Sequence, residues 1–334
     1  MKKYLFPMLM LALFSVGFTA SNEDDEIVIT PSNPEDGKTP LDDYFTIENA
    51  VFHQGDFPES TDGSEFGSVT LNSQVLAGGA NFITVKTEHK YTVFYLGIEG
   101  INGYLAYTPA APTQEGNYWV YTIRLNFSIT FNADITIYVC GKREDGHISK
   151  RHRGRITWVD SQSGDLNINL TFTTLKDVDL HLYLPDGNVI FYGNRGGINP
   201  ETGESYGLDH DSNAGCRIDS LNNENIFIPA SLVQNGTYRV VVNLYSNCDP
   251  TSGPTQWSVA ARYKGALVTN ELENATNPME GAYVANAGRG DMTEAIRFTI
   301  TNAQQSRGFN TTVWKPIPLT DMDQMKLEEA SWNN

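Results

Sequence analysis

The stretch that decides the fold is DVDLHLYLPDGNVIFYGNR, which occupies residues 177–195. Leucine recurs at every second position from Leu180 to Leu184, and this period of two is typical of a β-strand. The Pro, Asp, Gly and Asn residues at 185–188 have the chemistry of a tight turn. The apolar segment 189–192 follows at once. The stretch therefore predicts two strands that are joined as a hairpin.

Further strand candidates lie on both sides of this hairpin. In the segment 168–172, apolar Ile168, Leu170 and Phe172 alternate with polar residues. The other candidates of this block are Tyr238–Leu244, Trp257–Tyr263 and Ala295–Ile300. Because turn residues separate these segments, we expect a jelly-roll-like β-sandwich domain over residues 158–303.

A separate β-rich block precedes the hairpin. Ile135, Ile137 and Val139 alternate with polar or amphipathic neighbours, which gives one buried and one wet face. The other strand candidates are Phe82–Val85, Tyr91–Leu96 and Tyr118–Phe127. We expect an Ig-like β-sandwich over residues 45–157. The predicted fold class is therefore all-β, with two β-sandwich domains.

The C-terminal tail, residues 304–334, contains a helix signal. Thr320 is followed three residues later by Asp323, the spacing of a helix-capping pair. We therefore expect one short helix between Thr320 and the last residue.

The N-terminal segment MKKYLFPMLMLALFSVGFTA, residues 1–20, has a charged start, an apolar centre and small residues at its end. This pattern predicts a secretory signal peptide. Residues 21–44 are acidic and rich in Pro, Asn and Ser, and predict a flexible linker. We expect an exported protein, periplasmic, extracellular or associated with the cell surface, with no transmembrane helix in the mature chain. The segment resembles the export signals of Bacteroidetes surface lipoproteins, but the first cysteine is Cys140, so we favour a soluble form.

Composition narrows the function classes. The 334 residues include 40 acidic and 23 basic side chains, for a formal net charge of −17. Since nucleic-acid binding requires a cationic surface, we expect no nucleic-acid partner. The sequence contains no HExxH, GxSxG or GxxxxGK[ST] motif. We therefore predict no enzymatic activity.

A turn rich in oxygen ligands follows the hairpin. Asp209, Asp211 and Asn213 occupy alternate positions just before Gly215. Short oxygen side chains at this spacing can converge on a hard cation, and Ca²⁺ takes six to eight oxygens. The metal ligands that we predict are Asp179, Asp209, Asp211, Asn213 and Glu224, with Asp177 as the alternative to Asp179. The competing interpretation is an Asx-rich turn that caps its own backbone without a metal.

The chain has three cysteines. Cys216 and Cys248 lie in the same predicted domain, and an exported protein meets an oxidising compartment. We therefore favour a disulfide between them, with two separate buried thiols as the alternative. Cys140 is left over, and we expect a packed free thiol.

Several motifs of the second block occur in a characteristic order. They are DVDLH with its PDG turn, LDHD at 208–211, ENI at 224–226 and GTYRVVV at 236–242. In this order they resemble a bacterial domain family of unknown function found in YfaP-like secreted proteins, over about residues 166–263. The resemblance implies a β-sandwich, distantly similar to prepeptidase C-terminal modules, some of which bind calcium. A departure from the family is the long insert at 194–206.

The leading functional hypothesis is an exported, non-catalytic binding or accessory module of the bacterial envelope, stabilised by calcium. Its expected ligand is a glycan or a surface protein. One alternative is a secreted glycoside hydrolase, which needs two carboxyl groups about 5–10 Å apart across a cleft. The other alternative is a purely structural envelope protein.

Overall fold

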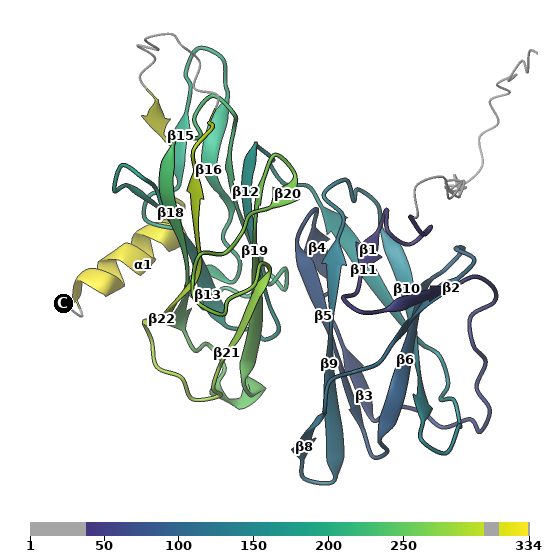
Figure 1. The fold of residues 1–334 in the computed structure, drawn as a ribbon. Coiled ribbons are helices and arrows are strands. Elements are labelled where there is room, and N and C mark those ends of the chain that lie inside the picture. The colour runs from purple at the N-terminus through teal and green to yellow at the C-terminus, as the bar shows by residue number, and fades with distance from the viewer. Residues whose placement is uncertain (1–37, 304–313, 333–334) are drawn as a thin grey trace, which may run out of the picture. The chain divides into compact units, whose positions relative to one another are not determined.

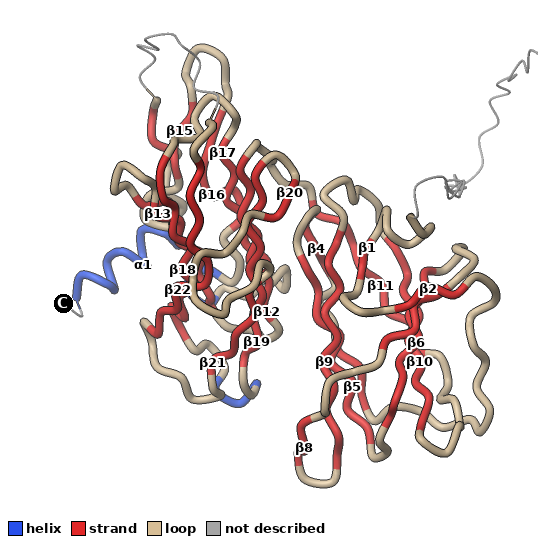
Figure 2. The backbone as a smooth tube through the Cα atoms, in the orientation of Figure 1, coloured by secondary structure: helices blue, strands red, loops and turns tan. Residues whose placement is uncertain are grey.

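The computed structural model describes residues 38–303 and 314–332, and strands make up nearly all of their regular structure (Figure 1, Figure 2). The prediction of an all-β, sandwich-type fold is confirmed. The signal peptide expected at 1–20, most of the linker expected at 21–44 and the tail residues 304–313 lie outside the described residues.

Eleven strands, called the first sandwich below, form two sheets around one hydrophobic core. One sheet has the order β1-β9-β5-β3, with β8 beside β9, and the other has the order β2-β7-β6-β10-β11-β4. All of these pairings are antiparallel except that of β11 with β4. The bounds are β1 Phe45–Thr46, β2 Val51–His53, β3 Ser68–Thr70, β4 Gln74–Leu76, β5 Ala80–Thr87, β6 Tyr91–Ile98, β7 Tyr104–Tyr107, β8 Thr113–Glu115, β9 Tyr118–Phe127, β10 Ile135–Arg143 and β11 His152–Val159.

The first core is built from the alternating apolar residues of these strands. Ile83 of β5 lies opposite Ile123 of β9, and both side chains are fully buried. Ile137 of β10 is buried in the same way, as its alternation predicted. Leu41 and Tyr44, which the sequence assigned to the linker, are also buried in this core.

The remaining strands, called the second sandwich, form two further antiparallel sheets around a second core. One sheet has the order β20-β19-β12-β17-β16-β15-β23, with β21 beside β19, and the other has the order β14-β13-β18-β22. The bounds are β12 Leu166–Phe172, β13 Asp177–Tyr183, β14 Val189–Ile190, β15 Gly196–Ile198, β16 Ser205–His210, β17 Asn223–Ile228, β18 Gly236–Ser246, β19 Thr255–Tyr263, β20 Ala266–Leu267, β21 Met279–Tyr283, β22 Asp291–Ile300 and β23 Lys315–Pro316. Short 3₁₀ turns lie at Ala214–Cys216 and Pro250–Ser252.

The predicted hairpin is the β13–β14 pair, in which Leu182 lies opposite Ile190. The Gly187 N–H donates to the Leu184 carbonyl, and the Leu184 N–H donates to the Asn188 carbonyl, which closes the turn. The leucines of β13 enter the core. The polar residues that alternate with them are buried too, so β13 has no wet face over most of its length.

The predicted short helix is α1, Asp321–Trp332, and it begins with the expected cap. The Asp323 N–H donates to the Thr320 hydroxyl, while the Thr320 N–H donates to the Asp323 carboxylate. The Tyr245 hydroxyl of β18 donates to the Lys326 carbonyl, so α1 lies against the second sandwich near β18 (Figure 1). Within the described ranges, no helix has the length and apolar character needed to cross a membrane.

The predicted disulfide between Cys216 and Cys248 is present. It joins the turn at Ala214–Cys216 to the segment that follows β18. Cys140 is a buried free thiol, as expected. Burial raises the pKa of this thiol to about 12.

Candidate metal centre

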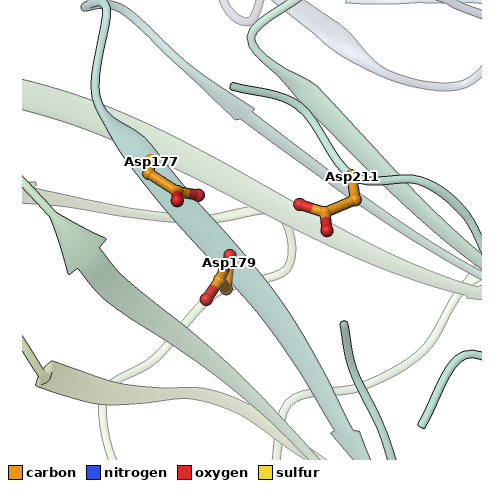
Figure 3. Close-up of side chains that lie close together, drawn as sticks. All are labelled: Asp177, Asp179 and Asp211. Carbon is orange, nitrogen blue, oxygen red and sulfur yellow. The ribbon is translucent and has the colours of Figure 1, made fainter. Parts of the chain in front are cut away.

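Three aspartates meet on one side of β13. Asp177 and Asp179 are separated by one residue, so the strand directs both side chains to the same face. Asp211 follows the end of β16 and points towards them (Figure 3). One carboxylate oxygen from each of the three residues lies within 4.8 Å of the other two. All three side chains are almost completely buried.

Glu224 of β17 adds a fourth carboxylate. Its Oε2 accepts a hydrogen bond of 2.7 Å from the Leu180 N–H, a backbone group of β13. Burial raises the pKa of Glu224, and the charges of Asp211 and Asp179 raise it further, so Glu224 lies near both. Below, Asp177, Asp179, Asp211 and Glu224 are called the acidic cluster.

Lys326 of α1 reaches into the acidic cluster and is itself fully buried. Its Nζ donates to Asp177 Oδ1 at 3.1 Å and to Asp211 Oδ1 at 3.5 Å, and it also donates to Asp179 Oδ1. The ammonium lies 4.3 Å from the ring centre of Tyr192 and 4.6 Å from that of Tyr245. The two rings add cation–π attraction to the ion pairs.

One ammonium faces several carboxylates, and burial together with repulsion between them raises the pKa values of Asp177, Asp211 and Glu224. Burial raises the pKa of Asp177 to about 9, and the charge of Asp179 adds to the rise. Burial likewise raises the pKa of Asp211 to about 7, against the opposing attraction of Lys326. The pKa of Glu224 lies well above its ordinary range, first because of burial and then because of neighbouring carboxylates.

The charge of Lys326 is secured by the same groups. Burial by itself would lower its pKa, but the surrounding carboxylates outweigh burial and hold the pKa well above its ordinary value. The ammonium is therefore fully protonated at neutral pH. Removing it would leave buried carboxylates without their cation, which is the costly way to break a buried ion pair.

Two of the predicted ligands lie outside the acidic cluster. The Asp209 carboxylate accepts hydrogen bonds from the Gln162 N–H at 2.6 Å and from the Asn225 side chain at 2.7 Å. The pairing register of β16 with β17 shifts between Leu208 and His210, so the strand alternation is broken at Asp209. This bulge separates the direction of Asp209 from that of Asp211.

Asn213 serves the backbone of its own loop. It adopts a left-handed conformation with a φ of 59°. Its side chain donates to the Lys176 carbonyl and to the Asn222 side chain, and accepts from the Asp219 N–H. These contacts engage both the nitrogen and the oxygen of the Asn213 amide away from the acidic cluster. Of the predicted ligands, the fold therefore brings together Asp179 and Asp211, with Asp177, the alternative to Asp179, beside them. Glu224 lies near enough for the charges of Asp211 and Asp179 to raise its pKa.

Lys326 was missed by the sequence reasoning. A signal was present, since Met322, Asp323 and Lys326 are spaced to share one helix face and all three are buried. A lysine and an aspartate on the inner stripe of a short helix indicate buried ionic partners. The pairing of Asp323 with Arg195, at 3.1 Å, is the second such contact.

The arrangement suits a hard cation. The acidic cluster offers only oxygen atoms in a buried position, and carboxylate oxygens are the ligands that hard divalent cations prefer. The triad of Asp177, Asp179 and Asp211 could hold a metal ion. Each carboxylate keeps at least one oxygen that no backbone N–H occupies.

Comparison with known proteins yields no family assignment. No family model matches the chain, and no curated protein is similar to it. Three solved structures align loosely. A pullulanase complexed with maltotriose, from Anoxybacillus sp. LM18-11, is 12% identical at a TM-score of 0.16, covering 57% of this chain and 25% of that one. Dimeric latent PorU from Porphyromonas gingivalis is 10% identical at a TM-score of 0.21, covering 76% of this chain and 21% of that one.

The third is SGBP-B of the Bacteroides ovatus mixed-linkage glucan utilization locus, in complex with a mixed-linkage heptasaccharide. It is 10% identical at a TM-score of 0.18, and the alignment covers 67% of this chain and 45% of that one. The chain thus spans less than half the length of each of the three proteins. Alignments at these scores bear on neither the fold nor the function.

Proposed function

We propose that the chain is an exported, non-catalytic binding or accessory module of a bacterial envelope, whose second sandwich is stabilised by calcium. The observation that carries the proposal is the acidic cluster, in which four buried carboxylates face a single ammonium. Such an excess of buried negative charge is relieved by protons or by a bound cation.

Calcium fits the acidic cluster better than the other common metals. All four side chains are carboxylates, and Ca²⁺ accepts mono- or bidentate carboxylates in flexible geometry. Mg²⁺ demands a small octahedral shell and keeps several waters, which a fully buried site supplies poorly. Zn²⁺ prefers nitrogen and sulfur ligands.

Two features support export. Residues 1–20 have the pattern of a secretory signal peptide. The Cys216–Cys248 disulfide belongs to an oxidising compartment. The motifs that resemble YfaP-like secreted proteins agree with this location, and they lie in the same sandwich as the acidic cluster.

The calcium part is tested by thermal unfolding of the full chain after chelator treatment. A ligand in hundredfold excess over its Kd stabilises the folded state by about 2.7 kcal/mol. For a unit of this size, that corresponds to a rise in melting temperature of roughly 5–10 °C. Asp211→Asn should abolish the rise. Asp209→Asn is the matched control, because Asp209 lies outside the acidic cluster and should leave the calcium response intact.

Two results together would remove calcium from the proposal. The melting curve would be unchanged at about 5–10 mM calcium, a range that covers weak extracellular sites, and a calorimetric titration would give no heat.

Export is tested separately by mass spectrometry of the mature N-terminus, where a retained Met1 would contradict it. The ligand class is tested by a glycan and polysaccharide binding screen with and without calcium. Product analysis on each hit separates a binding module from a glycoside hydrolase.

A further inference from the structure

The acidic cluster already holds a cation that belongs to the chain itself. The Lys326 ammonium bonds to one oxygen each of Asp177, Asp179 and Asp211. These are the three side chains whose oxygens lie close enough together to share a metal ion. The ammonium therefore stands at the position that such an ion would take.

The acidic cluster also has acceptors that Lys326 does not satisfy. Asp179 Oδ2, Asp211 Oδ2 and Glu224 Oε1 are buried and receive no hydrogen bond from an N–H or hydroxyl donor in the described part of the chain. The Asp211 carboxyl also contacts the Asp323 carboxyl, which helps to raise the pKa of Asp211. Backbone N–H groups occupy only Asp177 Oδ2 and Glu224 Oε2. Six carboxylate oxygens thus remain, three facing Lys326 and three without a donor.

The two cations exclude each other. Ca–O distances of about 2.3–2.6 Å place a calcium ion among the same oxygens that surround the ammonium. Two positive charges a few ångströms apart in a buried site repel strongly. Calcium can therefore enter only as the Lys326 side chain leaves.

The contacts that would be lost are part of the docking of α1. Among its described side chains, Leu327 is the one that packs against the hydrophobic core of the second sandwich. Met322 is buried beside the turn at Gly215. Polar contacts also hold the helix: Asp323 pairs with Arg195, Arg289 with Glu329, and Lys326 with the acidic cluster. Loss of the Lys326 ion pairs would therefore remove the most deeply buried polar part of this docking and leave the contacts of Leu327, Asp323 and Glu329 in place.

We infer that a hard divalent cation and the Lys326 ammonium bind the acidic cluster in exchange, so that cation binding weakens the docking of α1 on the second sandwich. The inference rests on the proposed calcium site and adds its regulation. Because coupling between two binding events is reciprocal, whatever weakens the docking of Lys326 must strengthen cation binding by the same factor. The C-terminal helix thereby becomes a calcium-responsive element.

The test compares calcium titrations of three full-length proteins after chelator treatment: the wild type, Lys326→Met and Lys315→Met. Lys315 of β23 is exposed and, within the described residues, forms no ion pair with the acidic cluster, so Lys315→Met is the matched control. Lys326→Met should lower the Kd for calcium at least about tenfold, within the usual range of coupling between sites. It should also melt lower than the wild type without calcium and gain the larger rise in melting temperature with it. Lys315→Met should behave as the wild type.

A second readout follows α1 in the wild type alone, so the test survives a Lys326→Met protein that does not fold. Hydrogen exchange of residues 321–332 should speed up when calcium is added, while exchange in β13 slows. Two results would overturn the proposed competition between calcium and Lys326 while leaving the calcium site in place. One is equal calcium affinity of the wild type and Lys326→Met. The other is a hydrogen-exchange rate of α1 that does not change when calcium binds. Absence of calcium binding in all three proteins would remove both.

Discussion

Removal of the disulfide should destabilise the second sandwich by an amount that follows from the loop it closes. Cys216 and Cys248 are 32 positions apart in the chain. In the chain-entropy model, freeing a loop of about 33 residues costs about 3–4 kcal/mol. For a unit of about 150 residues or more, this corresponds to a fall in melting temperature of roughly 6–16 °C.

The loss should reach beyond the bridge itself. The Gly215 N–H, one residue before Cys216, donates to Asp177 Oδ2 at 2.7 Å. A Cβ at Gly215 would lie 2.4 Å from the end of the Met322 side chain, so the same turn also lies against α1. A turn freed from Cys248 holds the acidic cluster and the helix less firmly.

The assay is urea unfolding of the double variant Cys216→Ser, Cys248→Ser, followed by hydrogen exchange of peptides from β13 and β18. Peptide resolution is needed because the chain has two cores, which need not unfold together. Reductant is the control: it should bring the wild type to the stability of the double variant and leave that variant unchanged. A destabilisation below about 1 kcal/mol would refute the loop argument, since it lies well under the expected loss.

Three further predictions concern other parts of the chain. Because burial raises the pKa of Asp177 from 3.8 to about 9, the folded state keeps a proton that the unfolded chain loses in that window. Stability without calcium should therefore fall as pH rises, with a share of up to about 1.4 kcal/mol per pH unit from Asp177, and Asp177→Asn should reduce the slope in urea titrations. Cys140, whose pKa burial raises to about 12, should resist iodoacetamide at neutral pH in the native protein and react in urea, as peptide mass spectrometry would show. Gly281→Ala would place a methyl group 2.1 Å from a ring atom of Trp257 and should cost about 1–3 kcal/mol in melting experiments. Gly288→Ala, with no atom within 4 Å, is its near-neutral control.

The sequence determined the features that arise from nearby residues. The period-two pattern from Leu180 to Leu184 and the turn at 185–188 predicted the β13–β14 hairpin, because alternation and turn chemistry act over a few residues. The pair of Thr320 and Asp323 predicted the start of α1 for the same reason. The disulfide followed from the expected compartment and from there being two cysteines in one predicted domain.

The acidic cluster was predicted only in part. Asp179 and Asp211 do meet, and Glu224 lies near them, but the regular spacing of Asp209, Asp211 and Asn213 does not bring those three together. A register shift in β16 redirects Asp209, and a left-handed backbone turns Asn213 towards its own loop. Both are single-residue departures from regular geometry, and one sequence does not reveal them.

Only the tertiary structure decided which cation the acidic cluster holds. Lys326 is 149 residues from Asp177, on a helix whose sequence specifies that it is helical but not where it docks. Docking depends on the summed charge of carboxylates that three separate segments bring together, and on two tyrosine rings that lie beside the ammonium. Local pattern sets the strands and the helix because those interactions span a few residues. The ion pair is long-range electrostatics in a buried site, which exists only once the sheets have formed.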